Sequence, residues 1–445
     1  MASDLLSIAR SGAMAARIAL DVTAQNIANA SSDGYVRRSV RLEELASSGG
    51  FMRTGDVSLS GVRLDRVIRN ADVFRQAEVR RTGADSARAD AEVAGLENIQ
   101  SAVEQSGVYP AIVGFEAALQ QLTADPVDPS LRAAVIEDAR TLTRTFNIAS
   151  TSLDAAGTGL RFEAADGVAQ VNQIATELAR VNLHLARASD ASSDQTALLD
   201  QRDSLLERLS QYTDVSTTIG IDETVEVRLG GASGPQLVIG GTATPLSMTS
   251  AADGTISFAL GAAPVTLTAG SLTGKAQALV KLADVHTRLD TLAAGLIAAV
   301  NAAQTSGIAL DGSAGQPLFA GSDAASFALA FEDGGKIATA PAGGGAGSRD
   351  PGNLTGLRNA LSSADPAGGM DALLFDISGN VAGRTVTRDA LGAIAGKARI
   401  ALQAQAGVSL DHEAVNLIRY QQAFQASGKV MQVAATLFDT LLAIR

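Results

Sequence analysis

Apolar side chains recur at a helical period in the first 28 residues of the chain. One set of positions in this stripe comes every seven residues: Leu6, Ala13, Leu20 and Ile27. Smaller residues follow three positions after the first three of them: Ala9, Ala16 and Thr23. A mean spacing of 3.5 residues predicts a helix over about 3–28 that packs closely against a partner helix. The polar run "NASSDG" then ends it.

The end of the chain carries a second stripe of this kind. Its large residues again come every seven positions: Leu410, Leu417, Phe424, Met431 and Phe438. We assign the companion positions four residues later: Ala414, Gln421, Gly428, Ala435 and Leu442. The pattern predicts a helix over 411–443 that pairs with the first one. Apolar burial in one pair is small beside the entropy of ordering two helices, so we expect lasting order only among neighbouring copies.

The residues between these ends divide by their hydrophobic period. Residues 31–90 read as an extended, partly β connecting segment, and residues 214–270 as short alternating strands separated by turn residues. Residues 91–213 and 271–407 are mainly amphipathic and helical, with Asp128 as a helix cap and Pro129 at the first helical position. Residues 307–380 read as weak strands and one loose helix, followed by a helix from about Thr387.

These patterns predict a mainly α fold with an inserted all-β domain, terminal coiled-coil helices and a long helical bundle. We expect four parts. The termini, 1–30 with 408–445, form a coiled-coil domain, and 31–90 connects it to the rest. Residues 91–213 with 271–407 form a discontinuous helical bundle, into which 214–270 is inserted as a β domain.

Composition narrows the classes of function. The 445 residues are 46% hydrophobic but only 4% aromatic, with no tryptophan and no cysteine, so disulfides and thiolate metal sites are excluded. A net charge of −12 argues against nucleic-acid binding. No apolar run approaches the roughly 20 residues that span a bilayer, so we expect no membrane insertion. Asp4 and the early arginines also argue against a cleavable leader.

Residues that could carry chemistry are few. The three histidines, His184, His286 and His412, share no ligand spacing, and "HEAVN" has Asn416 where a zinc-protease helix needs its second histidine. The run "GGGAGS" lacks the lysine of a phosphate-binding loop and reads as a flexible loop. No serine–histidine–acid arrangement is visible. We therefore expect no catalytic, metal or cofactor site.

A locally basic segment leaves two interpretations open. Ten arginines stand against six acidic residues between Arg37 and Arg81. They could meet an acidic partner surface or form salt bridges between subunits. They could equally form an ordinary solvated strand face.

Both ends of the chain resemble a known family. "NIANASSDGY" resembles the "NxANxxTPGY" signature of the bacterial flagellar rod, hook and hook-associated axial proteins, with Ser32 and Asp33 in place of Thr and Pro. Asp-Gly still favours a turn. The matching residues of the signature are Asn26, Ala28, Asn29, Gly34 and Tyr35. The last helix is similar to that of the hook-associated members through Asn416, Leu417, Tyr420, Gln421, Gln422, Phe424, Gln425, Ala426, Phe438, Asp439 and Leu441.

The resemblance implies a structural, non-enzymatic protein, secreted unfolded by type III export and assembled at the hook–filament junction outside the cell. It implies contacts with copies of itself, the hook protein, a second junction protein and an export chaperone on the C-terminal helix. Alternatives are a hook or rod subunit, or a secreted adhesin or enzyme that uses the β insert. The expected subunit-contact residues are Leu6, Ala13, Leu20, Asn26, Ile27, Asn29, Gly34, Tyr35, Leu410, Leu417, Tyr420, Phe424, Met431 and Phe438.

Overall fold

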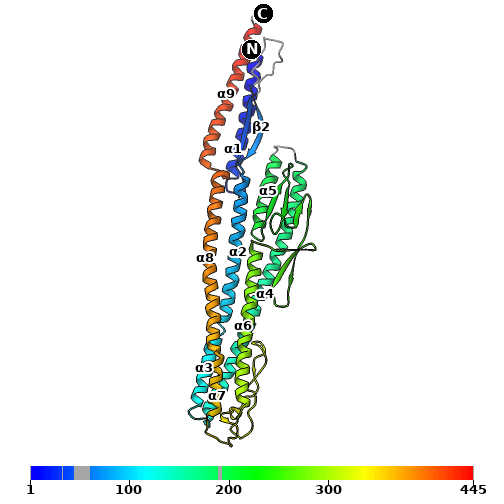
Figure 1. Ribbon diagram of the computed structural model, residues 1–445. Helices are drawn as coiled ribbons and strands as arrows, with labels where there is room; N and C mark the ends of the chain where they lie inside the picture. Colours follow the sequence, from blue (N-terminus) through cyan, green and yellow to red (C-terminus); the bar gives the residue numbers. More distant parts are fainter. Residues whose placement is uncertain (1, 33, 45–60, 189–192, 444–445) are drawn as a thin grey trace. The chain divides into compact units, whose positions relative to one another are not determined.

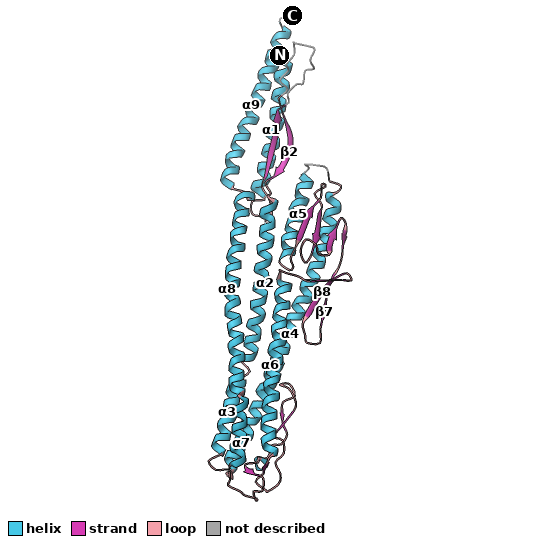
Figure 2. Ribbon diagram, viewed as in Figure 1, coloured by secondary structure: helices cyan, strands magenta, loops and turns pink. Residues whose placement is uncertain are grey.

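The computed structural model describes residues 2–32, 34–44, 61–188 and 193–443, and helices dominate it (Figure 2). The helices are α1 (Ala2–Ala28), α2 (Val73–Glu104), α3 (Val108–Leu122), α4 (Pro129–Leu185), α5 (Ser193–Ser210), α6 (Ser271–Thr305), α7 (Gly352–Ala364), α8 (Pro366–Ala406), α9 (Leu410–Ala443) and the 3-10 turn η1 (Gly334–Lys336). Strands lie between α5 and α6. The predicted fold class, mainly α with inserted β structure, is confirmed.

The chain forms two compact units. Residues 1–83, 172–245 and 392–445 make the first, which we call the terminal unit, and residues 84–171 and 246–391 make the bundle unit. Three of the four boundaries fall inside α2, α4 and α8, so each of these helices contributes to both units, and the fourth lies between residues 245 and 246. This division differs from the four parts expected from the sequence, which remain a prediction.

In the terminal unit, α1 lies beside α9 and against a hairpin (Figure 1). The hairpin strands are β1 (Arg38–Glu44) and β2 (Val62–Arg69), paired antiparallel with a bulge between Arg41 and Leu42. The pairing of the first and last helices, predicted from their stripes, is confirmed.

The connecting segment is helical earlier than predicted, because α2 begins at Val73. Asp72 explains the start. Its Oδ1 accepts from the backbone N–H of Phe74 at 2.9 Å and of Arg75 at 3.2 Å, as an N-cap residue does. The prediction of extended structure up to residue 90 was therefore wrong after residue 72.

The strands predicted within 214–270 form two antiparallel sheets. The terminal unit holds β3 (Ser216–Ile219), β4 (Val225–Arg228), β5 (Gln236–Ile239) and β6 (Thr242–Ala243) in that order. The bundle unit holds β7 (Leu246–Ser250), β8 (Ile256–Leu260) and β9 (Ala263–Val265). Along the sequence, Pro245 separates β6 from β7, and because proline has no backbone N–H it cannot donate to a strand ladder.

The bundle unit has an aromatic centre in its core. Phe319 packs edge-on against Phe327, with ring centroids 4.8 Å apart, and Phe115 and Phe146 pack against this pair. Phe319 opens strand β11 (Phe319–Ala320), which pairs with β12 (Ala328–Leu329), and β10 (Gly307–Ile308) pairs with β13 (Ala340–Pro341). Much of the region predicted as weak structure thus lies in the core.

Helix boundaries in the bundle unit follow sequence signals only in part. α4 begins at Pro129, and Asp128 Oδ1 accepts from the N–H of Ser130 and Leu131 at 2.7 and 2.9 Å, as predicted. α8 begins at Pro366, far before the predicted Thr387. Four glycines weaken the helical pattern there, but tertiary packing outweighs them, because the core buries Met370, Leu373 and Ile377.

Candidate functional site

The terminal helix pair, α1 with α9, carries most of the predicted contact residues. On α1 the small positions of the predicted stripe are buried: Ala9, Ala13, Ala16 and Thr23 are between 3 and 8% exposed. The larger residues Leu6, Leu20 and Ile27 are half-buried. The predicted α1 seam therefore faces a partner within the same chain.

The α9 seam differs from the prediction by one position. The residues that face α1 come three positions after the large stripe, not four: Glu413, Tyr420, Ser427 and Ala434. Glu413 and Ala434 are each 1% exposed. Of the assigned companions, Ala414, Gln421 and Ala435 are exposed and Gly428 is half-buried. Both spacings fit a mean period of 3.5, so the period alone does not distinguish them.

Two contacts define an antiparallel register between the helices. A methyl group on Gly12 would lie 3.1 Å from Ser427 Oγ, and Asn26 Nδ2 donates to Glu413 Oε2 at 3.2 Å. The contacts are two heptads apart on both helices. The small Gly12 and Ser427 let the helices approach closely.

The large stripe of α9 is only partly covered in the single chain. Leu417, Tyr420 and Met431 are half-buried. The large apolar side chains of α9 that are more than 40% exposed are Leu410, Val415, Ile418, Phe424, Val430, Val433, Leu437 and Phe438. Exposed apolar area of this extent along one helix indicates an interaction surface.

Five residues form a polar cluster where α1, the hairpin and α9 meet, which we call the joint cluster. They are Asn26, Tyr35, Arg37, Arg38 and Glu413. Asn26 is 1% exposed, and its amide makes four hydrogen bonds. Nδ2 donates to Arg38 O (2.8 Å) and Glu413 (3.2 Å), and Oδ1 accepts from Tyr35 Oη (2.9 Å) and Arg38 N (3.0 Å). Every donor and acceptor site of this amide is used.

Charge completes the joint cluster. Arg37 Nε donates to Glu413 Oε1 at 2.7 Å, and Arg37 N donates to Ala406 O at 2.9 Å. Burial raises the pKa of Tyr35 although Arg38 lies close by, so its hydroxyl stays protonated and can donate to Asn26. Asn26 thus joins α1 to the start of β1 and to α9 within one chain. Its part in a contact between subunits remains a prediction.

The other signature residues shape the turn after α1. Asn29 Nδ2 donates to Gln25 O at 2.9 Å, and Tyr35 N donates to Ser32 O at 3.2 Å. Gly34 has φ 76°, a left-handed conformation that glycine adopts without strain. Asp33 lies outside the described residues. The predicted turn is confirmed, whereas surface contact by Asn29 and Gly34 remains a prediction.

A second group, the hairpin cluster, holds β1 and β2 to α5. Asp200 accepts from Arg38 Nη2 at 3.1 Å and lies 2.7 Å from Arg69 Nη2. Asp203 pairs with Arg69 at 2.9 Å and Arg202 at 2.8 Å. These contacts and the Arg37–Glu413 pair give Arg37, Arg38 and Arg69 of the basic segment partners within the chain, and the buried Arg80 donates to Thr217 Oγ1 at 3.4 Å. The segment is therefore neither a bare strand face nor wholly free for an acidic partner.

Asp203 makes the terminal unit sensitive to acid. Burial alone would raise its pKa, but Arg202 and Arg69 lower it below the ordinary value of 3.8. A depressed folded-state pKa stabilises the fold above the unfolded pKa, and this stabilisation is lost as pH falls through the folded value. We expect Asp203→Asn to destabilise the terminal unit by about 3 kcal/mol near pH 7, and by less at a pH well below 3.8, where the parent carboxylate becomes protonated.

Hydrogen exchange of α5 and β2 amides at both pH values measures this difference. Asp21→Asn serves as the control, since Asp21 is exposed on α1, and it should leave exchange unchanged at either pH. An equal destabilisation by Asp203→Asn at both pH values would contradict the assignment.

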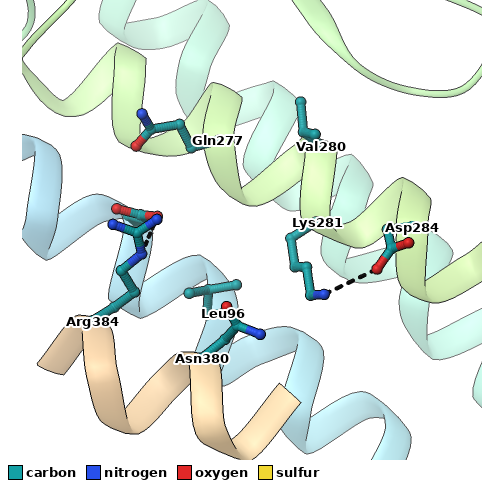
Figure 3. A pocket seen from close by; sticks show the side chains of 8 residues that line it. Leu96, Gln277, Val280, Lys281, Asp284, Asn380 and Arg384 are labelled. Carbon is teal, nitrogen blue, oxygen red and sulfur yellow. Dashed lines mark hydrogen bonds and ion pairs between the residues drawn. The ribbon is translucent and has the colours of Figure 1, made fainter. Parts of the chain in front are cut away.

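A hollow of about 440 Å³ lies in the bundle unit between α2, α6 and α8 (Figure 3). Its charged side chains satisfy one another. Arg384 pairs with Glu92 at 3.0 Å, and Lys281 pairs with Asp284 at 2.9 Å and with Asp376 at 2.7 Å. Polar groups that are already paired offer little to a substrate.

The structure does align Ser150, His286 and Asp290, which sequence reasoning missed because they lie on two helices. His286 Nε2 lies 3.5 Å from Ser150 Oγ, and Nδ1 lies 3.1 Å from Asp290 Oδ2. Ser150 is 1% exposed, so no substrate can reach its hydroxyl. This contact joins α4 to α6. Over the described residues, no cluster of metal-ligating side chains and no helix fit to cross a membrane occurs.

Sequence reasoning also missed the charged members of the joint cluster. Glu413 stands seven residues before Tyr420, which was selected as a contact residue. A carboxylate at a seam position is costly unless it is paired. That position was therefore the available signal for an internal partner.

Three family models match the chain. The helical domain of flagellar hook-associated protein FlgK matches residues 93–319, just over half of the chain. The flagella basal body rod protein model matches residues 6–35, and the C-terminal model of the flagellar basal body rod FlgEFG proteins matches residues 403–444. The last two ranges contain the joint cluster's α1 and α9 residues.

Individual relatives agree with these models. Flagellar hook-associated protein 1 of Salmonella typhimurium is 29% identical over 335 residues, which are 71% of this chain and 59% of the relative. The Bacillus subtilis protein of the same name is 29% identical over 220 residues, 48% of this chain and 43% of its own. The chain thus spans less than two thirds of the length of these relatives.

A solved structure shares the fold. The flagellar hook junction protein FlgK from Burkholderia pseudomallei superposes with a TM-score of 0.62 at 16% identity, covering 74% of this chain and 100% of that one. Such low identity supports the fold alone. The helical-domain model covers more than half of the sequence, and on that match the chain belongs to the family of flagellar hook-associated proteins FlgK.

Proposed function

We propose that the chain is a structural axial protein of the bacterial flagellum that joins the hook to the filament through its terminal helices. The observation that carries the proposal is the set of exposed apolar side chains of α9 named above, which we call the α9 face. The helix that carries them is held in a defined register against α1. A helix that leaves this much apolar surface uncovered within its own chain gains by packing against further helices.

The proposed partners follow from the same surface and from the relatives' names. Neighbouring copies would cover α9 in an axial layer, with the hook protein on one side and a second hook-associated junction protein on the other. An export chaperone would cover the α9 face before assembly. The protein would be secreted by type III export, would lie outside the cell at the hook–filament junction and would have no enzymatic activity.

A hook or rod subunit is the second candidate, favoured by the two rod-protein models at the chain ends. The helical-domain match over 93–319 favours the junction protein instead. Genetic removal separates the two. Loss of a hook or rod subunit should leave cells without a complete hook, whereas loss of a junction protein should leave complete hooks that shed flagellin.

The proposal is tested by making the α9 face polar. Val415, Ile418 and Val433 are 65, 54 and 60% exposed, so their replacement by glutamine should leave the chain folded. In cells lacking the native copy, we expect this triple variant to abolish swimming and to release flagellin into the medium. Circular dichroism of the purified chain should stay unchanged.

A matched triple variant controls for the loss of aliphatic surface. Ile221, Ile239 and Val280 are also exposed, at 108, 48 and 59%, but lie outside the helix pair. Their replacement by glutamine should preserve swimming. Normal swimming by the α9 variant would overturn the proposal.

A further inference from the structure

The apolar contacts between α1 and α9 would also allow a second register, in which α9 is shifted by one heptad along α1. The α9 residues facing α1 recur every seven positions, so a shift of one heptad places Ala434 opposite Gly12, where Ser427 now lies. Ala434 is no larger than Ser427, so the close approach at Gly12 survives the shift. In this shifted pair Tyr420 would face Asn26.

The opposite shift is disfavoured by shape. It places Tyr420 opposite Gly12, where a methyl group would already be 3.1 Å from the smaller Ser427. It also moves Asn26 opposite Ala406, the last residue of α8, so that Asn26 loses α9 as a neighbour. One competing register therefore remains.

That register is reached by unwinding the first two turns of α9, and little holds those turns in place. From Leu410 to Asn416, Glu413 is buried, Asn416 is half-buried and the others are exposed. Glu413 contacts Asn26 at 3.2 Å and Arg37 at 2.7 Å. Both partners are fixed from other directions, Asn26 by Arg38 and Tyr35, and Arg37 by its backbone bond to Ala406.

We infer that Glu413 is a positioning residue that sets the register of α9 on α1, and that the one-heptad shift pairing Gly12 with Ala434 competes when Glu413 is lost. A buried polar residue in a helical seam selects register by this means, because every other alignment leaves it unpaired. In the shifted register Glu413 would move past the end of α1. Asn26 would then face the side chain of Tyr420 instead of the carboxylate of Glu413.

The chain contains no cysteine, so two introduced cysteines report register without interference. Gly12→Cys with Ser427→Cys reports the observed register, and Gly12→Cys with Ala434→Cys reports the shifted one. Each pair is made in the full chain carrying Glu413, Glu413→Ala or, as control, Asp411→Ala. Asp411 is an exposed carboxylate in the same helical turn.

The readout is the fraction of linked chain at equilibrium with a glutathione buffer, as the ratio of the two pairs. We expect Glu413→Ala to lower the ratio of observed to shifted linkage by about tenfold or more, since losing one partner of a buried ionic contact is strongly unfavourable. Asp411→Ala should keep the parent ratio. The measurement uses the isolated chain and is independent of the proposed function.

Two results would overturn the inference. An unchanged ratio in Glu413→Ala would mean that the short connection at residues 407–409 sets the register. Loss of linkage in both pairs would mean that Glu413 holds the helices together without selecting their alignment.

Discussion

Asn26→Ala is expected to loosen α1, the hairpin and the start of α9 together, by about 3 kcal/mol. The substitution removes one side chain but takes the hydrogen-bond partner from three buried groups: the backbone N–H and C=O of Arg38, and Oε2 of Glu413, whose Oε1 keeps Arg37. An unpaired buried polar group costs more than the hydrogen bond it has lost is worth. The effect should appear in all three elements at once because the amide joins them.

Hydrogen exchange followed peptide by peptide measures this effect, since a global melt would mix the two compact units. Exchange in α1 and β1 should rise about a hundredfold, with the bundle unit unchanged. Asn29→Ala is the matched control from the same signature, because the Asn29 amide bonds only one turn back, to Gln25 O. If both variants exchange alike, the joint cluster does not hold these elements together.

Arg132→Met is expected to be the most damaging single change in the bundle unit, at about 4 kcal/mol. Arg132 is 1% exposed at the start of α4. Its guanidinium donates to Pro126 O at 2.6 Å, to Gly334 O and Ile337 O at 2.9 Å, and to Thr339 Oγ1 at 2.9 Å. Methionine fills similar space but removes the donors to the buried carbonyls of Pro126 and Ile337, while Gly334 O keeps only the N–H of Ile337.

Exchange of the amides of residues 334–340 reports the loss most directly, because Arg132 holds that segment to α4. Arg144 lies three turns further along α4 and is exposed, so Arg144→Met should change stability by less than about 0.5 kcal/mol. Equal effects of the two substitutions would show that the arginine's contacts contribute nothing beyond its helical position.

Local signals in the sequence predicted the elements that depend on neighbours along the chain. The α1 seam followed from alanines at heptad spacing, and the α4 start followed from Asp128 and Pro129, whose capping geometry needs no distant partner. The turn around Gly34 followed from the need for a left-handed residue. Each of these depends on residues within one helical turn or one seam.

Features that depend on distant partners could not be predicted in this way. The early part of α8 contains four glycines, and only burial of Met370, Leu373 and Ile377 by other helices explains why it is helical. The hairpin arginines find Asp200 and Asp203 more than 130 residues away, so their pattern alone left two interpretations open. The α9 companion positions were placed one residue too late because both spacings fit a mean period of 3.5, and the polar Glu413 and Ser427 gave no apolar signal at the observed positions.

The two terminal helices report on different processes when they are mutated. Beside the α1 seam that faces α9, a second stripe at Ala15 and Val22 is also buried. It runs between Ser11 and Asn26, which hydrogen-bond to β2 at Val62 and to β1 at Arg38. With both flanks of α1 covered, enlarging its alanines should interfere with the chain's own folding. Substitutions by polar residues on the α9 face should instead yield well-folded chains that stay monomeric and do not assemble.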